Sequence, residues 1–329
     1  MVLSRTKNNI KRTIGRFFNI HRAVGKKDIF LFSSRRSGST WLLEIINAER
    51  GVKYSDQPPD WDSNDRRLDT MNVNRYNIVC PNDEDKMKLK SYFQDLLKDK
   101  IQVNPPWNIL DRNYDFFTNR YILKMTDTHT LIKWFEVNFD SQIVYLIRHP
   151  IAVALSIMKL GWGHTLDVFL NNDRFVNEWL RSSEFEFALE IIDGGDFFDQ
   201  LILEWVLENL VPLRLIERSE ARNWTVFSYE ELVLEPELII DVLGKKLDLE
   251  NTDKMKESIR TPSKNAKGES REEIKGRDKR FLVTKWENRV SEEEKKRAFE
   301  ILERFELSVY SKDRYFPRED LLIFSPDLE

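Results

Sequence analysis

Residues 28–47 read Asp-Ile-Phe-Leu-Phe-Ser-Ser-Arg-Arg-Ser-Gly-Ser-Thr-Trp-Leu-Leu-Glu-Ile-Ile-Asn, and this stretch decides the fold. Its first part, residues 28–33, is a short apolar run that ends in polar residues, which is typical of a buried parallel strand. Residues 33–40 are polar and contain Gly38, so we expect a loop there and a helix at 41–47. A strand, a polar glycine-containing loop and a helix in this order predict a P-loop-like phosphate site.

The same alternation continues along the chain. Further strands are expected at 121–125, 143–147 and 223–228. Helices are expected at 83–100, 130–139, 150–159, 238–246 and 291–305, with 165–218 mostly helical, 51–82 irregular and 260–280 a polar loop. This pattern predicts an α/β fold with a central parallel sheet flanked by helices, in which ligands bind beyond the carboxyl ends of the strands. Because no linker-like stretch interrupts it, we expect a single domain over residues 28–329.

The composition excludes several classes of protein. A formal net charge of −4 argues against a general nucleic-acid binder, although it does not exclude a local basic pocket. Cys80 is the only cysteine, so no disulfide forms within the chain and a reducing, cytoplasmic location is expected. No run of about twenty apolar residues is present, so no membrane-spanning helix is expected.

Residues 1–27 form a basic N-terminal segment with eight lysines and arginines and no acidic residue. Ile10, Ile14, Phe17 and Phe18 lie at helical spacing within it. One interpretation is a solvated leading helix. The other is a weak peripheral contact with an anionic membrane, since this charge attracts acidic lipids without anchoring the chain firmly.

The loop at 33–40 has the chemistry of a polyanion site. Gly38 lets backbone N–H groups turn inward, and the start of the following helix adds a positive partial charge. Hydroxyl donors and two full positive charges come from Ser37, Ser39, Thr40, Arg35 and Arg36. The loop is not a Walker A motif, because it lacks the first glycine and has no lysine after Gly38. A P-loop-type small-molecule kinase is therefore only an alternative interpretation.

Residues 36–41, Arg-Ser-Gly-Ser-Thr-Trp, resemble the 5′-phosphosulfate loop of the sulfotransferases, which transfer a sulfuryl group from the nucleotide PAPS and release PAP. The resemblance implies that Arg36 occupies the family's catalytic cation position and that Trp41 packs near the adenine. It also implies that the rest of the loop binds the donor, through Arg35, Ser37, Gly38, Ser39 and Thr40.

Residues 143–156 resemble the family's 3′-phosphate motif, an apolar strand that ends in an arginine, with a serine eight residues later. Arg148 and Ser156 match it. An arginine at a strand end suits paired hydrogen bonds to a phosphate. A phosphate on the 3′ oxygen distinguishes PAPS from ATP, so this motif also argues against a kinase.

Two further matches are weaker. Residues 227–236 resemble the family's Tyr-Glu-Asp-Leu…Pro segment, which implies that Tyr229 lies near the adenosine. The alternative is a strand that simply ends in a capped helix. Lys267 and Gly268 fall where the family has an Arg-Lys-Gly loop over the 3′-phosphate, and an exposed polar loop accounts for them equally well.

The sequence departs from the family's pattern at the position of the general base. The family's pattern after the second strand is Lys-Thr-His, and here Lys124 fits while Thr126 stands in the histidine position. His129 comes three residues late and is the first candidate, because its ordinary pKa suits proton transfer. Asp127 is the second candidate. Asp56 and Asp60 are weaker ones, near the place where some glycan-modifying members carry a Glu-Pro pair. No cysteine or histidine cluster has metal-ligand spacing, so no metal is expected.

The resemblance does not fix the acceptor, which we expect to be a small molecule or carbohydrate with a hydroxyl or amine. Trp61, Trp107 and Trp162 favour a sugar or a lipid-linked sugar, although tryptophan often serves only the core. His164 is a candidate acceptor contact. A non-catalytic PAP- or PAPS-binding protein is a further alternative, because the histidine is displaced. The oligomeric state stays open.

Overall fold

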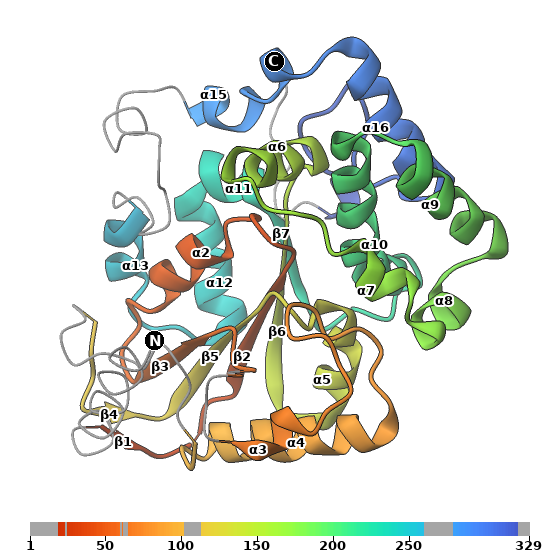
Figure 1. Cartoon of the computed structure of the whole chain (residues 1–329). Coiled ribbons are helices and arrows are strands. Elements are labelled where there is room, and N and C mark those ends of the chain that lie inside the picture. The colour runs from red at the N-terminus through yellow and green to blue at the C-terminus, as the bar shows by residue number, and fades with distance from the viewer. Residues whose placement is uncertain are drawn as a thin grey trace.

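Within the described residues, five parallel strands form the central sheet, in the order β3-β5-β2-β6-β7 (Figure 1). The structure is a computed structural model that describes residues 19–23, 25–59, 61, 65–101, 113–259 and 279–321. The strands of this sheet are β2 (Asp28–Ser33), β3 (Val52–Asp56), β5 (Arg120–Met125), β6 (Ser141–Ile147) and β7 (Thr225–Ser228). A separate pair joins β1 (Ile20–His21) to β4 (Phe117–Thr118). The predicted fold class, a parallel sheet flanked by helices, is confirmed.

The register places the ends of the two motif-bearing strands side by side. Central strand β2 pairs with both β5 and β6, and Phe32 lies opposite Met125 on one side and Tyr145 on the other. All strands of the sheet run in the same direction, so the segments after β2, β5 and β6 emerge at one edge. That edge is where parallel sheets bind ligands.

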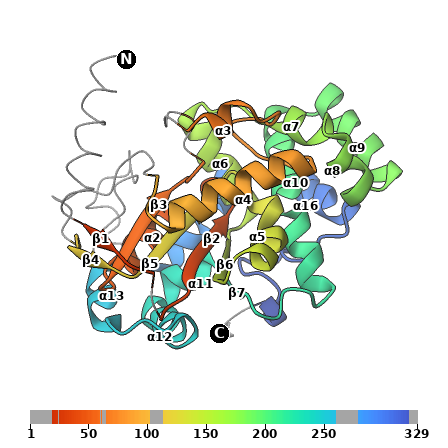
Figure 2. The same ribbon diagram turned by 90° about the horizontal axis from the view of Figure 1, so that it is seen from below.

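Helices cover both faces of the sheet (Figures 1 and 2). The helices are α2 (Ser39–Ile46), α3 (Arg66–Asp69), α4 (Asp83–Leu97), α5 (Ile132–Asn138), α6 (Pro150–Leu160), α7 (Leu166–Leu170), α8 (Asp173–Trp179), α9 (Ser182–Gly194), α10 (Phe197–Glu217), α11 (Tyr229–Leu234), α12 (Pro236–Leu247), α13 (Thr252–Ile259), α15 (Lys279–Thr284) and α16 (Glu292–Arg304). Short 3-10 helices are η1 (His129–Leu131), η2 (Glu287–Arg289) and η3 (Glu319–Leu321). None of the helices in the described ranges has the length and apolar content needed to cross a membrane.

Alternating side chains of β2 divide the core in two. Ile29 and Leu31 pack with apolar residues of α2, α12 and α13 on one face. Phe30 and Phe32 pack with those of α4, α5, α6 and α10 on the other face. All four side chains are fully buried, which explains why the sequence of this strand is apolar on both faces.

The predicted elements are found with small shifts, and one strand of the central sheet was missed, as was the separate β1–β4 pair. Residues 51–82 were expected to be irregular, yet Val52–Asp56 forms edge strand β3. Its polar residues hid it, because at this edge Lys53 is buried in an ion pair with Asp99 (Nζ to Oδ1, 2.5 Å). Ser291 caps α16 in the predicted capping box. Residues 1–18, Asp60, Trp107, Lys267 and Gly268 lie outside the described residues.

Arg120 ties the amino-terminal end of β5 to its surroundings, and its side chain is almost fully buried. The guanidinium donates to the carbonyl oxygens of Lys27 and Leu247 and to Oε1 of Gln142. We expect R120A to lower the free energy of unfolding by about 3 kcal/mol, because it leaves these buried acceptors without donors. Urea unfolding measures the change. K27A is the control, since it removes only an exposed ion pair with Asp140 and should cost less than about 1 kcal/mol.

Candidate active site

The turn between β2 and α2 has an unusual backbone. Arg36 has φ 62° and Gly38 has φ 91°, so both lie in the left-handed region. Within the turn the buried hydroxyls of Ser34 and Ser37 share a hydrogen bond (Oγ to Oγ, 2.7 Å). Helix α2 begins at Ser39, with Gly38 as its N-cap, two residues earlier than expected. The turn therefore presents the N-terminus of a helix to the ligand edge of the sheet.

Arg36 and Arg148 meet at this edge although they come from different strands. Arg148 Nη1 donates to the main-chain carbonyl oxygen of Arg36 (2.9 Å), and Arg36 Nε donates to Oγ of Ser156 (3.0 Å). Burial, and then the nearby positive charge of Arg148, lower the pKa of Arg36. The structure thus holds two like charges close together, an arrangement that a bound anion would stabilise.

Tyr229 closes the other side of the same turn. The Arg148 guanidinium carbon lies 4.1 Å from the Tyr229 ring centroid, and the Trp41 ring lies 6.3 Å from it, edge on. The Tyr229 ring also lies against Gly38, where an added Cβ would come within 2.4 Å of Cδ2. Arg148 Nε is buried and has no hydrogen-bond partner among the described residues. A buried donor of this kind is suited to hydrogen bonding with a ligand.

Lys124 joins the end of β5 to the first turn of α2. Its Nζ lies 2.5 Å from Oδ1 of Asp56 and donates to Oγ1 of Thr40 (3.1 Å). Thr40 lies in the first turn of α2. The amine therefore lies between α2 and the end of edge strand β3, and its positive charge is paired with the Asp56 carboxylate.

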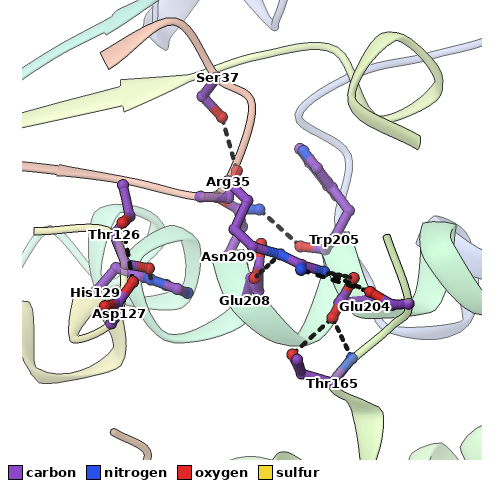
Figure 3. A network of polar contacts seen from close by, with 12 residues as sticks. Arg35, Ser37, Thr126, Asp127, His129, Thr165, Glu204, Trp205, Glu208 and Asn209 are labelled. Carbon is purple, nitrogen blue, oxygen red and sulfur yellow. Dashed lines mark hydrogen bonds and ion pairs between the residues drawn. The ribbon is translucent and has the colours of Figure 1, made fainter. Parts of the chain in front are cut away.

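Asp127 and His129, whose side chains appear beside Thr126 in Figure 3, differ in how deeply they are buried. Asp127 is partly exposed and accepts hydrogen bonds from Thr126 Oγ1 (2.9 Å) and Gln57 Nε2 (3.1 Å). Burial raises its pKa to about 6, against the lowering effect of Thr126 and Lys124. His129 is fully buried, with Nδ1 2.9 Å from the Thr126 carbonyl oxygen, and burial lowers its pKa to about 4. At neutral pH the carboxylate is the stronger base of the two.

The Arg35 side chain points toward Glu204 and Glu208 of α10 (Figure 3). Its Nη2 bonds to Oε2 of Glu204, and its Nε lies 3.6 Å from Oε1 of Glu208. Sequence reasoning missed this pairing, because nothing marks two acidic residues of a distant apolar helix as partners of the loop.

Glu230 is another buried carboxylate that the sequence did not reveal. It accepts a hydrogen bond from the backbone N–H of His149 (3.1 Å) and one from the Tyr310 hydroxyl (3.0 Å). Burial raises its pKa to about 7. His149 stacks on Trp286 (centroids 4.1 Å apart), so both side chains support the turn that carries Arg148. In the sequence, the only indication of a role for Glu230 and His149 is that they directly follow Tyr229 and Arg148.

Comparison with known protein families shows which family the chain belongs to. The family model of the sulfotransferase domain matches residues 26–308. The chain belongs to the sulfotransferase family. It is a PAPS-dependent sulfotransferase, and sulfuryl transfer is its reaction.

Solved sulfotransferase structures are also similar, at low sequence identity. A mouse sulfotransferase complexed with PAP is 16% identical, with TM-score 0.42 over 90% of this chain and 89% of that one. The sulfotransferase domain of the curacin biosynthetic pathway is 18% identical, with TM-score 0.45 over 85% and 97%. The sulfotransferase domain of the Synechococcus PCC 7002 olefin synthase is 16% identical, with TM-score 0.43 over 86% and 96%. Among curated proteins, none matches this sequence.

The contact between Gly38 and Tyr229 gives a direct test of this site. We expect G38A to weaken PAP binding about tenfold or more, because the new methyl group would displace the ring that packs on Arg148. Calorimetric titration with PAP measures the loss. G25A is the control, since Gly25 has a similar φ of 83° and open space around it. Equal PAP affinity in both variants would count against the assignment of this turn.

Proposed function

We propose that the Arg36 and Arg148 turns bind one molecule of PAPS and that Asp127 takes the proton of a hydroxyl or amine acceptor. The observation that carries this proposal is the hydrogen bond from Arg148 to the Arg36 carbonyl oxygen (2.9 Å). It brings together two cationic turns, each from a motif that resembles one end of the PAPS-binding site. Arg36 would bind the 5′-phosphosulfate, and Arg148 with Ser156 the 3′-phosphate. Ser37, Gly38, Ser39, Thr40, Trp41 and Tyr229 would complete the donor site.

The chemistry requires positioning and charge stabilisation more than covalent participation by the protein. The bond between the acceptor oxygen and sulfur forms while the bond between sulfur and the bridging phosphate oxygen breaks, and PAP leaves with the electron pair. Arg36, Lys124 and the N-terminus of α2 would stabilise the charge that develops on PAP. The acceptor proton passes to the base.

Asp127 is favoured over His129 as that base. Asp127 is partly exposed at the ligand edge, whereas the His129 ring is fully buried, and its Nδ1 is engaged by the Thr126 carbonyl oxygen. Gln57 and Thr126 hold one oxygen of the carboxylate, which leaves the other for an acceptor hydroxyl. Asp56 is engaged with Lys124, which makes it a less suitable base.

A carbohydrate or lipid-linked sugar remains our proposal for the acceptor. Trp162 supports it, because its indole is 45% exposed and its ring centroid lies 5.8 Å from the Arg36 guanidinium carbon. An exposed indole beside the reacting group suits stacking on a sugar ring. Trp61, by contrast, packs against the core.

We also propose a cytoplasmic enzyme that makes a weak membrane contact through its basic N-terminal segment, residues 1–27. The single cysteine supports a reducing compartment, and burial raises the pKa of the Cys80 thiol to about 12, which suppresses its reactivity. The eight basic residues of the segment support attraction to acidic lipids.

A transfer assay with sulfur-labelled PAPS tests the proposed reaction. The acceptor panel holds monosaccharides, a glycolipid, an aryl alcohol and a primary amine. We expect label on a hydroxyl-bearing sugar, and at least about a hundredfold lower turnover by R36Q, because that variant lacks the charge that stabilises the leaving phosphate. R314Q, which changes an exposed arginine, is the control. PAP binding without transfer to any acceptor would favour the non-catalytic alternative, and turnover of ATP but not PAPS would favour a kinase.

The pH profile discriminates between the two bases. A base acts in its deprotonated form, so with Asp127 in this role kcat/KM should fall as pH drops through about 6. With His129 as the base, activity should persist down to about pH 4. We expect D127N to lower kcat by about a hundredfold or more and to abolish this dependence. A D127N enzyme with the parent profile would contradict the assignment.

A further inference from the structure

Arg35 and Arg36 are consecutive in the turn between β2 and α2, which we call the donor turn, but their side chains reach different helices. The left-handed backbone of Arg36, with φ 62°, redirects the chain between them. Arg36 reaches Ser156 of α6, whereas Arg35 reaches the middle of α10. Their charges therefore serve different neighbours, although the sequence alone assigns both to the donor.

Glu204 links Arg35 to the segment between α6 and α7 (Figure 3). One carboxylate oxygen, Oε2, accepts from Arg35 Nη2. The other, Oε1, accepts from the backbone N–H of Thr165 (2.5 Å) and from its hydroxyl (2.6 Å). The Arg35 guanidinium also donates to the carbonyl oxygen of Gly163 (3.4 Å from Nη2). Arg35 and Glu204 thus hold the same short segment at two points.

The segment between α6 and α7 carries Trp162, an exposed residue whose ring lies beside Arg36. It begins at Gly161, whose φ of 65° ends α6, and Trp162 follows directly. The Trp162 ring lies over the Arg36 guanidinium. Because Gly163 and Thr165 are bonded to Arg35 and Glu204, the place of Trp162 depends on these bonds.

The Arg35–Glu204 ion pair is largely buried, so the loss of either partner should disturb the surrounding structure. Glu204 is 1% exposed and the Arg35 side chain 20%. Loss of either partner would leave a charge uncompensated in the interior and would release the bonds to Gly163 and Thr165. Glu208 lies one turn further along α10 and is equally buried. Burial and the charge of Glu204 hold the pKa of Glu208 well above its usual range.

We propose that Arg35 and Glu204 are positioning residues for the acceptor, which fix residues 161–165 so that Trp162 lies beside Arg36, and that Arg35 does not bind the donor. The proposal rests on the proposed function, since it assumes transfer at Arg36. The two arginines of the turn then have different roles. Arg36 binds the donor, and Arg35 affects the acceptor indirectly, by holding the segment that carries Trp162.

Hydrogen exchange and PAP titration test the proposal on the intact chain. We expect R35Q and E204Q to speed exchange of the Thr165 amide by about tenfold or more, because its acceptor is lost or displaced. The dissociation constant for PAP should stay within about twofold of the parent value, since no donor contact is removed. E208Q is the matched control. Glu208 is equally buried on α10 and also lies beside Arg35, but the bonds to Thr165 and Gly163 come from Glu204 and Arg35, so this variant should change neither quantity.

Kinetics with the acceptor found in the transfer panel completes the test. R35Q and E204Q should raise KM for the acceptor about tenfold with KM for PAPS unchanged, and the double variant should be no worse than either single one. A tenfold loss of PAP affinity in R35Q, with unchanged exchange at Thr165, would overturn the proposal and return Arg35 to the donor site. If the parent protein itself does not bind PAP, the proposed function fails instead.

Discussion

The hydrogen bond between the Arg148 guanidinium and the Arg36 main-chain carbonyl oxygen is the contact on which the rest of the site depends. It is possible because β2 and β6 are neighbours in a parallel sheet, so that the residues after both strands emerge together. It also imposes a constraint, because it holds two guanidinium groups close in a partly buried place. Such an arrangement is stable against its own repulsion when a polyanion lies between the charges.

The surrounding residues hold Arg36 and Arg148 in place through packing and hydrogen bonds. Tyr229 lies under Arg148 and against Gly38, Ser156 accepts from Arg36, and Glu230 holds the backbone of the Arg148 turn. The proposed acceptor side is built on a separate set of bonds, from Arg35 through Glu204 to Thr165. The left-handed backbone of Arg36 is what makes this division possible.

The sequence predicted the parts of the molecule that follow from local patterns. The run at Asp28–Ser33 is apolar on both faces, and only a buried parallel strand has that pattern with a glycine loop behind it. The neighbourhood of Arg36 and Arg148 followed from the rule for parallel sheets. Strand β3 was missed because its polar residues are satisfied by distant partners, such as Asp99 for Lys53. The contact between Arg35 and Glu204 joins residues far apart in sequence, and the burial of His129 depends on how η1 packs; neither has a local signature.

Binding of PAP and of adenosine 5′-phosphate to the parent protein and to R148Q, measured by calorimetry, tests the central claim most directly. The two ligands differ only in the 3′-phosphate. If the Arg148 turn binds that group, the parent should prefer PAP by at least about tenfold, and R148Q should lose most of that preference. An R148Q protein that keeps the full preference for PAP would show that the two turns do not share one nucleotide.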